Sequence, residues 1–252
     1  MKKVIVLVLF INYTFSQNVK KVLVWEENFN SVALDSTVWN YELGNGCPNL
    51  CGWGNNEAQV YTNKNHQLIE GCLVIEAKKE GNIYTSTRIT TKDKKEFQYG
   101  KIEVRAKLPV GTGLWPAFWM LGSNISEVGW PKCGEIDILE YVGKQPNIAF
   151  TSLHTQESHG NTINTKKTTI PSIEEGFHTY AIDWNKDNIQ FFIDDISVYI
   201  FQPSIKNENT WPYNQPFYFI INVAIGGNFG GPTIDDFVLP QEFKIDYIKV
   251  FE

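Results

Sequence analysis

Short runs of alternating or β-branched residues, separated by turn signals, recur along nearly the whole chain, while helical periodicity is nearly absent. Strand patterns do not alternate with helical ones, which argues against a parallel βαβ sheet. The sequence therefore predicts an all-β fold, a two-sheet antiparallel β-sandwich. Asp194-Asp195 predicts a hairpin turn. We expect strands at residues 22–25, 73–78, 85–90, 101–108, 135–142, 148–154, 178–184, 189–193, 197–201, 217–223 and 243–251.

The start of the chain predicts a signal peptide. Lys2-Lys3 precedes an apolar run from Val4 to Ile11, which is far shorter than a membrane span, and Thr14-Phe15-Ser16 is an imperfect cleavage site. We expect residues 1–16 to be removed and residues 17–252 to form one domain, since no linker or internal repeat interrupts them. No later segment could span a membrane, so we expect a secreted or exported protein, extracellular or periplasmic.

Charge and composition limit the kinds of molecule that we expect the protein to bind. The net charge of −6 argues against nucleic acid or an anionic membrane as the main partner. It does not argue against a neutral polysaccharide, and aromatic residues make up 14% of the chain, some of which are free to stack on sugars. We expect a monomer.

The four cysteines do not have the spacing of a zinc site. In an exported chain Cys47 and Cys51 could form a small loop disulfide, although sequence does not show the geometry that such a bond needs. Cys72 lies in an apolar run and is expected to be a buried free thiol, and Cys133 is also expected to be free. Neither has a recognisable histidine base, which disfavours a cysteine nucleophile.

Three carboxylates, Glu135, Asp137 and Glu140, lie in one short apolar run. Burial and mutual repulsion both oppose their ionisation, so such a run calls for a functional reason. In a strand Glu135 and Asp137 share a face, and one extra residue near Ile138-Leu139, a β-bulge, brings Glu140 to the same face. In a helix, at about 100° per residue, the three would scatter. The spacing therefore predicts a bulged strand that presents three acids.

Retaining glycoside hydrolysis requires two carboxyl groups about 5–5.5 Å apart, one as nucleophile and one as acid/base. From the residues alone two alternatives stay open. The run could be a surface strand with charged positions, or its clustered carboxylates could bind Ca²⁺ or Mg²⁺.

Residues 134–140 resemble the signature of glycoside hydrolase family 16, and the chain is most similar to its laminarinase (endo-β-1,3-glucanase) branch. The resemblance covers nearly all of the chain after residue 20. It implies a jelly roll with a concave substrate cleft, and a family 16-like catalytic domain at residues 17–252. Further similar blocks lie at residues 55–61, 100–107, 115–121, 177–184 and 221–227.

The resemblance also implies the roles of the three acids. Glu135 would be the nucleophile, Glu140 the general acid and then general base, and Asp137 would lie between them and tune the nucleophile. Crowding agrees with this division, because at least one pKa in the cluster must rise. No cofactor is needed for catalysis.

Several residues are candidates for sugar contact, each weighed against a plainer alternative. The alternative for Asn45 is turn chemistry, that for Trp115 and Trp119 is core packing, and that for Arg88 is a solvated charge or an ion pair with Glu57. His154 is expected to face the cleft beside the acid/base Glu140, with a structural role as the alternative. Trp211, Glu57 and Gln59 are weaker candidates, and His178 is expected to be structural. Gly226–Gly231 is expected to form a turn near the cleft rim rather than a phosphate loop. The substrate-binding candidates are Asn45, Arg88, Trp115, Trp119, Trp130 and His154.

The resemblance further implies a structural Ca²⁺ on the convex face, with Asp246 as the carboxylate ligand and backbone oxygens near Glu27 and Gly71. The plainer alternative is a surface aspartate.

The implied function is a retaining endo-β-glucanase that hydrolyses internal β-1,3 bonds, with mixed β-1,3/1,4 bonds as a second possibility, in laminarin-like polysaccharide. Two rivals are an agar or carrageenan hydrolase of the same fold and a non-catalytic β-glucan-binding module. The second rival normally lacks the acids that this chain retains.

Overall fold

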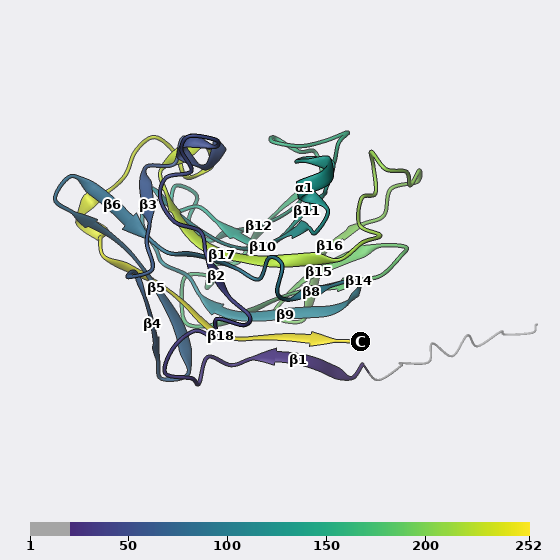
Figure 1. The fold of residues 1–252 in the computed structure, drawn as a ribbon, viewed down its shortest axis with the longest axis horizontal. Helices are drawn as coiled ribbons and strands as arrows, with labels where there is room; N and C mark the ends of the chain where they lie inside the picture. Colours follow the sequence, from purple (N-terminus) through teal and green to yellow (C-terminus); the bar gives the residue numbers. More distant parts are fainter. Residues whose placement is uncertain (1–20) are drawn as a thin grey trace, which may run out of the picture.

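Two curved sheets pack face to face in the structure, a computed structural model that describes residues 21–252 (Figure 1). The predicted signal peptide and the first residues of the predicted domain lie outside this range. Among the described residues, no helix is long and apolar enough to cross a membrane.

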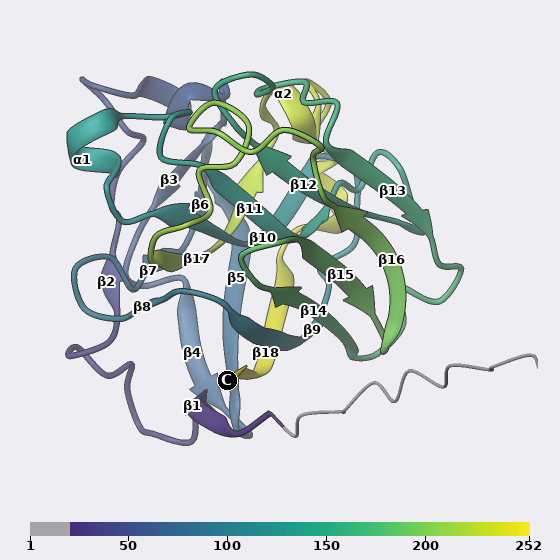
Figure 2. The same ribbon diagram turned by 90° about the vertical axis from the view of Figure 1, so that its right-hand side faces the viewer.

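The inner sheet has eight strands and carries the acidic run. One face of this sheet, the open face, has loops on both sides, and its other face packs against the second sheet (Figures 1 and 2). In spatial order its strands are β13 (Thr165–Thr169), β12 (Ile148–His154), β11 (Glu135–Tyr141), β10 (Leu114–Gly122), β17 (Phe217–Ile225), β7 (Arg88–Thr90) and β2 (Asn40–Tyr41), and β8 (Glu96–Phe97) also pairs with β17.

The outer sheet has ten strands, and among the described pairs only β3 with β6 is parallel. In spatial order its strands are β16 (Ile196–Phe201), β15 (Ile189–Ile193), β14 (His178–Trp184), β9 (Gly100–Lys107), β18 (Gln241–Phe251), β5 (Cys72–Glu80), β6 (Ile83–Ser86) and β3 (Gln59–Tyr61), with β1 (Leu23–Glu27) beside β18 and β4 (His66–Ile69) beside β5. The helical turns are η1 (Cys51–Gly54), α1 (Ile125–Val128), α2 (Gly227–Gly230) and η2 (Asp236–Val238).

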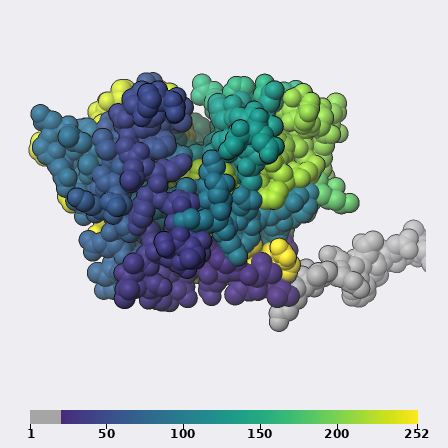
Figure 3. Space-filling view, viewed as in Figure 1, coloured from purple at the N-terminus to yellow at the C-terminus, as the bar shows by residue number. Residues whose placement is uncertain are grey.

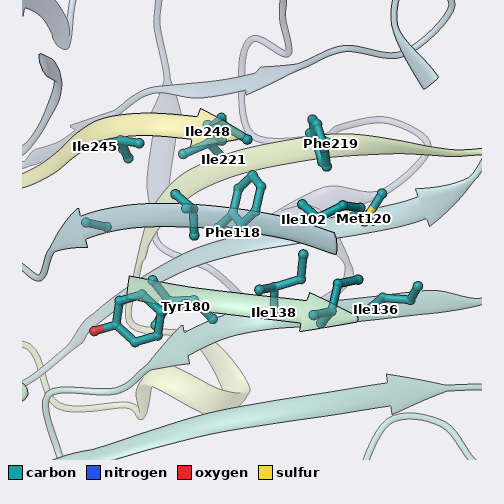
Figure 4. Packing of buried hydrophobic residues seen from close by; sticks show 14 of the residues in the cluster. Ile102, Phe118, Met120, Ile136, Ile138, Tyr180, Phe219, Ile221, Ile245 and Ile248 are labelled. Carbon is teal, nitrogen blue, oxygen red and sulfur yellow. The ribbon is translucent and has the colours of Figure 1, made fainter. Parts of the chain in front are cut away.

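The core fills the space between the sheets. Phe118 of β10 and Ile138 of β11 point into it from the inner sheet, and Ile102 of β9 and Ile248 of β18 meet them from the outer one (Figure 4). Burial of this apolar surface is the main force that holds the two layers together. The predicted antiparallel sandwich is therefore confirmed.

The predicted strands at residues 148–154, 178–184 and 189–193 have the observed bounds, and Asp194 and Asp195 form the hairpin turn with φ of 48° and 61°. Four strands of the inner sheet were not predicted, the two-residue strands β2 and β8 and the longer β10 and β13. In β13, Thr-Lys-Lys-Thr-Thr offers no apolar alternation, although lysines suit an exposed sheet edge. In β10, Pro116 conceals the strand, yet it pairs only with β17 and precedes Ala117, the first residue opposite β11.

Candidate active site

A β-bulge in β11 puts the three acids on one face. Asp137 lies opposite Ser152 and Glu140 opposite Phe150, so three steps along β11 match two along β12. The partner β10 shows the same offset, since Trp119 and Phe118 lie opposite Asp137 and Leu139. The extra residue lets Glu140 return to the side of Asp137 while Ile138 and Leu139 remain in the core. The predicted bulge is confirmed at the predicted place.

Glu135 and Asp137 share a histidine. His154 Nε2 lies 3.2 Å from Asp137 Oδ2 and 3.6 Å from Glu135 Oε1. The indole N–H of Trp130 donates a hydrogen bond of 2.7 Å to Glu135 Oε2. Tyr213 donates from its hydroxyl to the carbonyl of His154 at 3.0 Å, which fixes the strand beneath the ring. His154 therefore adjoins Glu135 and Asp137, whereas we had expected it beside Glu140.

Glu140 has a donor on each oxygen. The Trp115 indole N–H donates to Oε1 at 3.1 Å, and the Ser152 hydroxyl donates to Oε2 at 3.3 Å. Glu140 is 8% exposed and Asp137 is 3% exposed. These contacts fix the Glu140 carboxyl in the floor of the inner sheet, where a sugar bound on that face would meet it.

Burial raises the pKa of both buried acids well above the ordinary range. For Asp137 the neighbouring Glu135 adds to the effect of desolvation, and for Glu140 the charge of Asp137 does so while His154 opposes it. The crowding argument made from the sequence is consistent with these shifts. A carboxyl that keeps its proton near neutral pH is what general acid catalysis requires.

Glu135, Asp137 and His154 also form the one group of three metal-ligating side chains among residues 21–252, with ligand atoms within 4.8 Å of one another. Ca²⁺ and Mg²⁺ prefer sets of oxygen ligands, and here the imidazole itself bridges the two carboxylates. The arrangement fits the hard-cation alternative poorly.

The three tryptophans predicted to contact sugar differ in exposure. Trp130 is 46% exposed and forms an edge contact with His159, at 5.3 Å between ring centroids. Trp115 and Trp119 are half-buried on β10, and Trp119 donates to Asn222 Oδ1 at 2.8 Å. Each indole thus has a fixed orientation on the face that carries the acids. Their contact with sugar stays a prediction.

Arg88, on β7 of the inner sheet, belongs to a cluster with Glu42, Trp53 and Trp119 that we call the cleft wall. Its guanidinium is stacked between the rings of Trp53 and Trp119, at 4.5 and 5.0 Å from their centroids, and forms an ion pair with Glu42. The alternative partner proposed from the sequence, Glu57, is therefore wrong. With Arg88 only 8% exposed, its first role is to brace two tryptophans.

Glu57 and Gln59 are connected to the cleft wall by hydrogen bonds. Glu57 accepts hydrogen bonds from Gln59 Nε2 at 2.6 Å and from the Tyr61 hydroxyl at 3.2 Å, and Tyr61 in turn accepts one from Asn222. Gln59 is fully buried, so the idea that it reaches the cleft is wrong. These contacts link Trp119, through Asn222 and Tyr61, to Glu57, which follows the loop that contains Trp53.

Two further candidates have clear surroundings. Trp211 is 2% exposed and stacks on Phe201, so it is a core residue and its candidacy for sugar contact is wrong. His178 is structural as expected, because its ring bonds to Asp194 Oδ2 at 2.6 Å and to the carbonyl of Ser172. Asn45 is exposed, and its side chain accepts the N–H of Cys47, which is turn chemistry. A sugar contact by Asn45 stays a prediction.

Cys47 and Cys51 form a disulfide in the loop that follows Asn45. Cys72 and Cys133 are free as expected, although Cys72 is half-buried rather than buried. Burial raises the pKa of Cys133 to about 12, and the charge of Glu135 adds to the shift. A thiol with such a pKa makes a poor nucleophile.

The proposed calcium ligand is already paired. Asp246 forms an ion pair with Arg105, whose guanidinium opposes a cation at the same carboxylate. The Asp246 carboxylate, paired in this way, fits a calcium ion poorly, so no part of the mechanism is assigned to one; the backbone oxygens expected near Glu27 and Gly71 stay a prediction.

Ser152, Asn222 and Glu42 were missed from the sequence. Ser152 lies two residues before His154 on the same strand face, so strict alternation would have identified it. Asn222 and Glu42 are placed by pairings across more than 40 residues, for which a single sequence offers no signal.

The surface of the molecule is hollowed between two groups of loops. A space-filling view shows this hollow between the loop segment around residue 50 and the segment around α1 (Figure 3).

Comparison with known proteins agrees with the site. Residues 53–249 match the glycosyl hydrolases family 16. The chain is 36% identical over 247 residues to a beta-glucanase of Rhodothermus marinus, covering 91% of this chain and 84% of the relative. It is 37% identical over 253 residues to a glucan endo-1,3-beta-glucosidase of Cryptopygus antarcticus, covering 90% and 91%.

Among solved structures, the laminarinase from Flavobacterium sp. UMI-01 has 70% sequence identity and a TM-score of 0.91, and the alignment covers 92% of this chain and 100% of that one. The family pattern covers more than half of the chain, and the sandwich and its acidic strand agree with it. The chain therefore belongs to the glycosyl hydrolases of family 16.

Proposed function

We propose that the chain is a retaining endo-β-glucanase that hydrolyses internal β-1,3 bonds in laminarin-like glucan, and mixed β-1,3/1,4-glucan as a second substrate. The observation that carries the proposal is the bulged β11, which presents Glu135, Asp137 and Glu140 together on the open face. Family membership and the named activities of the relatives support the substrate class.

In the first step Glu135 attacks the anomeric carbon and the bond to the leaving oxygen breaks. Glu140 gives its proton to that oxygen as the bond breaks, so the leaving sugar departs as an alcohol. In the second step Glu140, now a carboxylate, takes a proton from water. The water oxygen attacks the anomeric carbon and Glu135 leaves, which restores both acids.

Surrounding groups support these roles. The Trp130 indole orients Glu135, and Asp137 with His154 sets the charge around it. The raised pKa of Glu140 keeps the proton available for the first step. Stacking on exposed tryptophan faces would hold a neutral glucan without requiring basic side chains.

A Glu135→Gln variant tests the proposal on laminarin, lichenan and agarose. We expect laminarin turnover to fall by roughly a thousandfold or more, because an amide is a poor nucleophile. Glu127→Gln, on exposed α1, is the matched control and should keep wild-type turnover. Wild-type turnover in Glu135→Gln would refute the assignment. Cleavage of agarose alone would favour the galactan hydrolase, and binding without release of reducing ends would favour the binding module.

Retention is tested separately, by NMR of the first product formed from a β-glucan. A β-anomer that later mutarotates is expected for double displacement, and a first-formed α-anomer would exclude it.

We also propose that the protein is exported, on the basis of its N-terminal sequence. Sequencing of the N-terminus of protein recovered from outside the producing cell should begin at Gln17. An N-terminus at Met1 in that fraction would contradict the proposal.

A further inference from the structure

Two hydroxyl groups, those of Ser152 and Thr165, lie in a row beside the Glu140 carboxyl. Ser152 Oγ is 3.3 Å from Glu140 Oε2, and Thr165 Oγ1 is 3.1 Å from Ser152 Oγ. Ser152 is buried on β12, and Thr165 is half-buried on the edge strand β13. The three groups form a short chain of hydrogen bonds from the acid toward the edge of the sheet.

The strand register produces this chain. Ser152 lies opposite Asp137 on one side and opposite Thr165 on the other, so all three share the open face of the inner sheet. The bulge then brings Glu140 to that face, within reach of Ser152. The contacts thus depend on three neighbouring strands of one sheet.

The two donors of Glu140 differ in what they can do. The Trp115 indole N–H can only donate, so it favours the ionised carboxylate. A hydroxyl both donates and accepts. With Glu140 ionised, Thr165 donates to Ser152 and Ser152 donates to Oε2. With a proton on Oε2, the direction reverses and the Thr165 hydrogen turns toward solvent.

We propose that Ser152, supported by Thr165, is a positioning residue that holds Glu140 in place in both of its protonation states. The proposal rests on the acid/base role assigned to Glu140 above. That role requires Glu140 to alternate between acid and carboxylate within each turnover, and a donor-only partner would oppose one of the two states.

Other charged groups near Glu140 are few, which makes a pH test interpretable. Strands β10 and β17 and the turn α2 contain no charged residue. On β13, Lys167 Nζ donates a hydrogen bond to Gln145 Oε1 and lies 5.3 Å from the centroid of the Phe150 ring. The charged groups on the packed strands are Glu135, Asp137, His154, Lys166 and Lys167.

The test compares Ser152→Ala with wild type on two substrates, laminarin and a 2,4-dinitrophenyl β-laminaribioside. The aryl leaving group needs almost no proton in the first step, so kcat/KM for the aryl substrate should change less than twofold, while kcat/KM for laminarin should fall roughly tenfold. The basic limb of the laminarin pH profile should move up by roughly half a pH unit, since the ionised carboxylate loses a charge-assisted donor. Ser152→Thr keeps a hydroxyl and should restore both properties.

Two further variants complete the design. Thr165→Val should reproduce a smaller part of both effects. Thr151→Val is the matched control, because the neighbouring Thr151 hydroxyl is buried without a hydrogen-bond partner, and it should behave as wild type.

Equal losses in kcat/KM on both substrates in Ser152→Ala, or an unchanged basic limb, would overturn the proposal. Glu140→Gln separates this result from a failure of the proposed function. If that variant keeps laminarin activity, the acid/base assignment itself is wrong. If it is inactive on laminarin while Ser152→Ala is unaffected, only the hydroxyl proposal fails.

Discussion

Glu42→Gln is the most informative change to the cleft wall. Arg88 is 8% exposed and has Glu42 as its ion-pair partner, with the Trp53 and Trp119 rings on its two sides. The variant keeps the shape of the side chain and removes its charge. The guanidinium is then left in a largely buried site without its ion-pair partner, and Glu57 is the other acid close enough to act on it.

The size of the effect follows from this burial. Removing one partner of a buried ion pair typically costs about 3–5 kcal/mol. The Glu42 side chain is 30% exposed, so water screens part of the charge. We therefore expect the free energy of unfolding to fall by about 2–3 kcal/mol and the melting temperature by roughly 4–12 °C.

Urea unfolding followed by tryptophan fluorescence measures the loss. Glu242→Gln is the matched control, because the Glu242–Lys244 pair is exposed and should contribute about 0–1 kcal/mol. We also expect a higher KM for laminarin, because Arg88 braces Trp119. A loss below 1 kcal/mol in Glu42→Gln would show that the stacked tryptophans, rather than the ion pair, hold Arg88.

Two further predictions concern charge at the site and on the opposite sheet. Glu140→Gln should melt at a higher temperature than wild type near pH 8. The pKa of Glu140 is raised in the folded protein, so at a pH above that pKa the ionised carboxylate destabilises the folded state. This destabilisation decreases as the pH falls from the pKa of the folded protein toward the lower pKa of the unfolded chain. The difference should vanish near pH 4 in calorimetry, and a lower melting temperature for the variant at pH 8 would contradict the assigned shift. Because Arg105 neutralises Asp246, a chelator should leave the melting temperature unchanged; a fall that CaCl₂ reverses would instead establish the calcium site.

The acidic strand was predictable because its pattern is local. Alternation fails once between Asp137 and Glu140, and one extra residue repairs it, so the bulge could be placed from the sequence. Strands with an apolar alternation, such as β14 and β15, were predictable for the same reason.

What escaped prediction depends on distant partners. Trp211 lies in a polar loop, and only the fold brings Phe201 against it. Arg88 pairs with Glu42, 46 residues away, whereas the sequence argument named only Glu57. β13 has no buried face to produce an alternation, although it contributes Thr165. Local patterns thus predicted the acids and the nearby Trp130, whereas the partner of Arg88 and the surroundings of Trp211 come from long-range pairing.

The hydrogen bonds from Trp119 through Asn222 and Tyr61 to Glu57 have a consequence for recognition. They join the floor of the cleft to the base of the adjoining loop, so these parts are positioned before any sugar arrives. Little binding free energy then goes into ordering this side of the protein. Discrimination between glucans would therefore rest on whether the polysaccharide can adopt the curvature of a fixed surface, and stiff chains would be rejected by their own conformational cost.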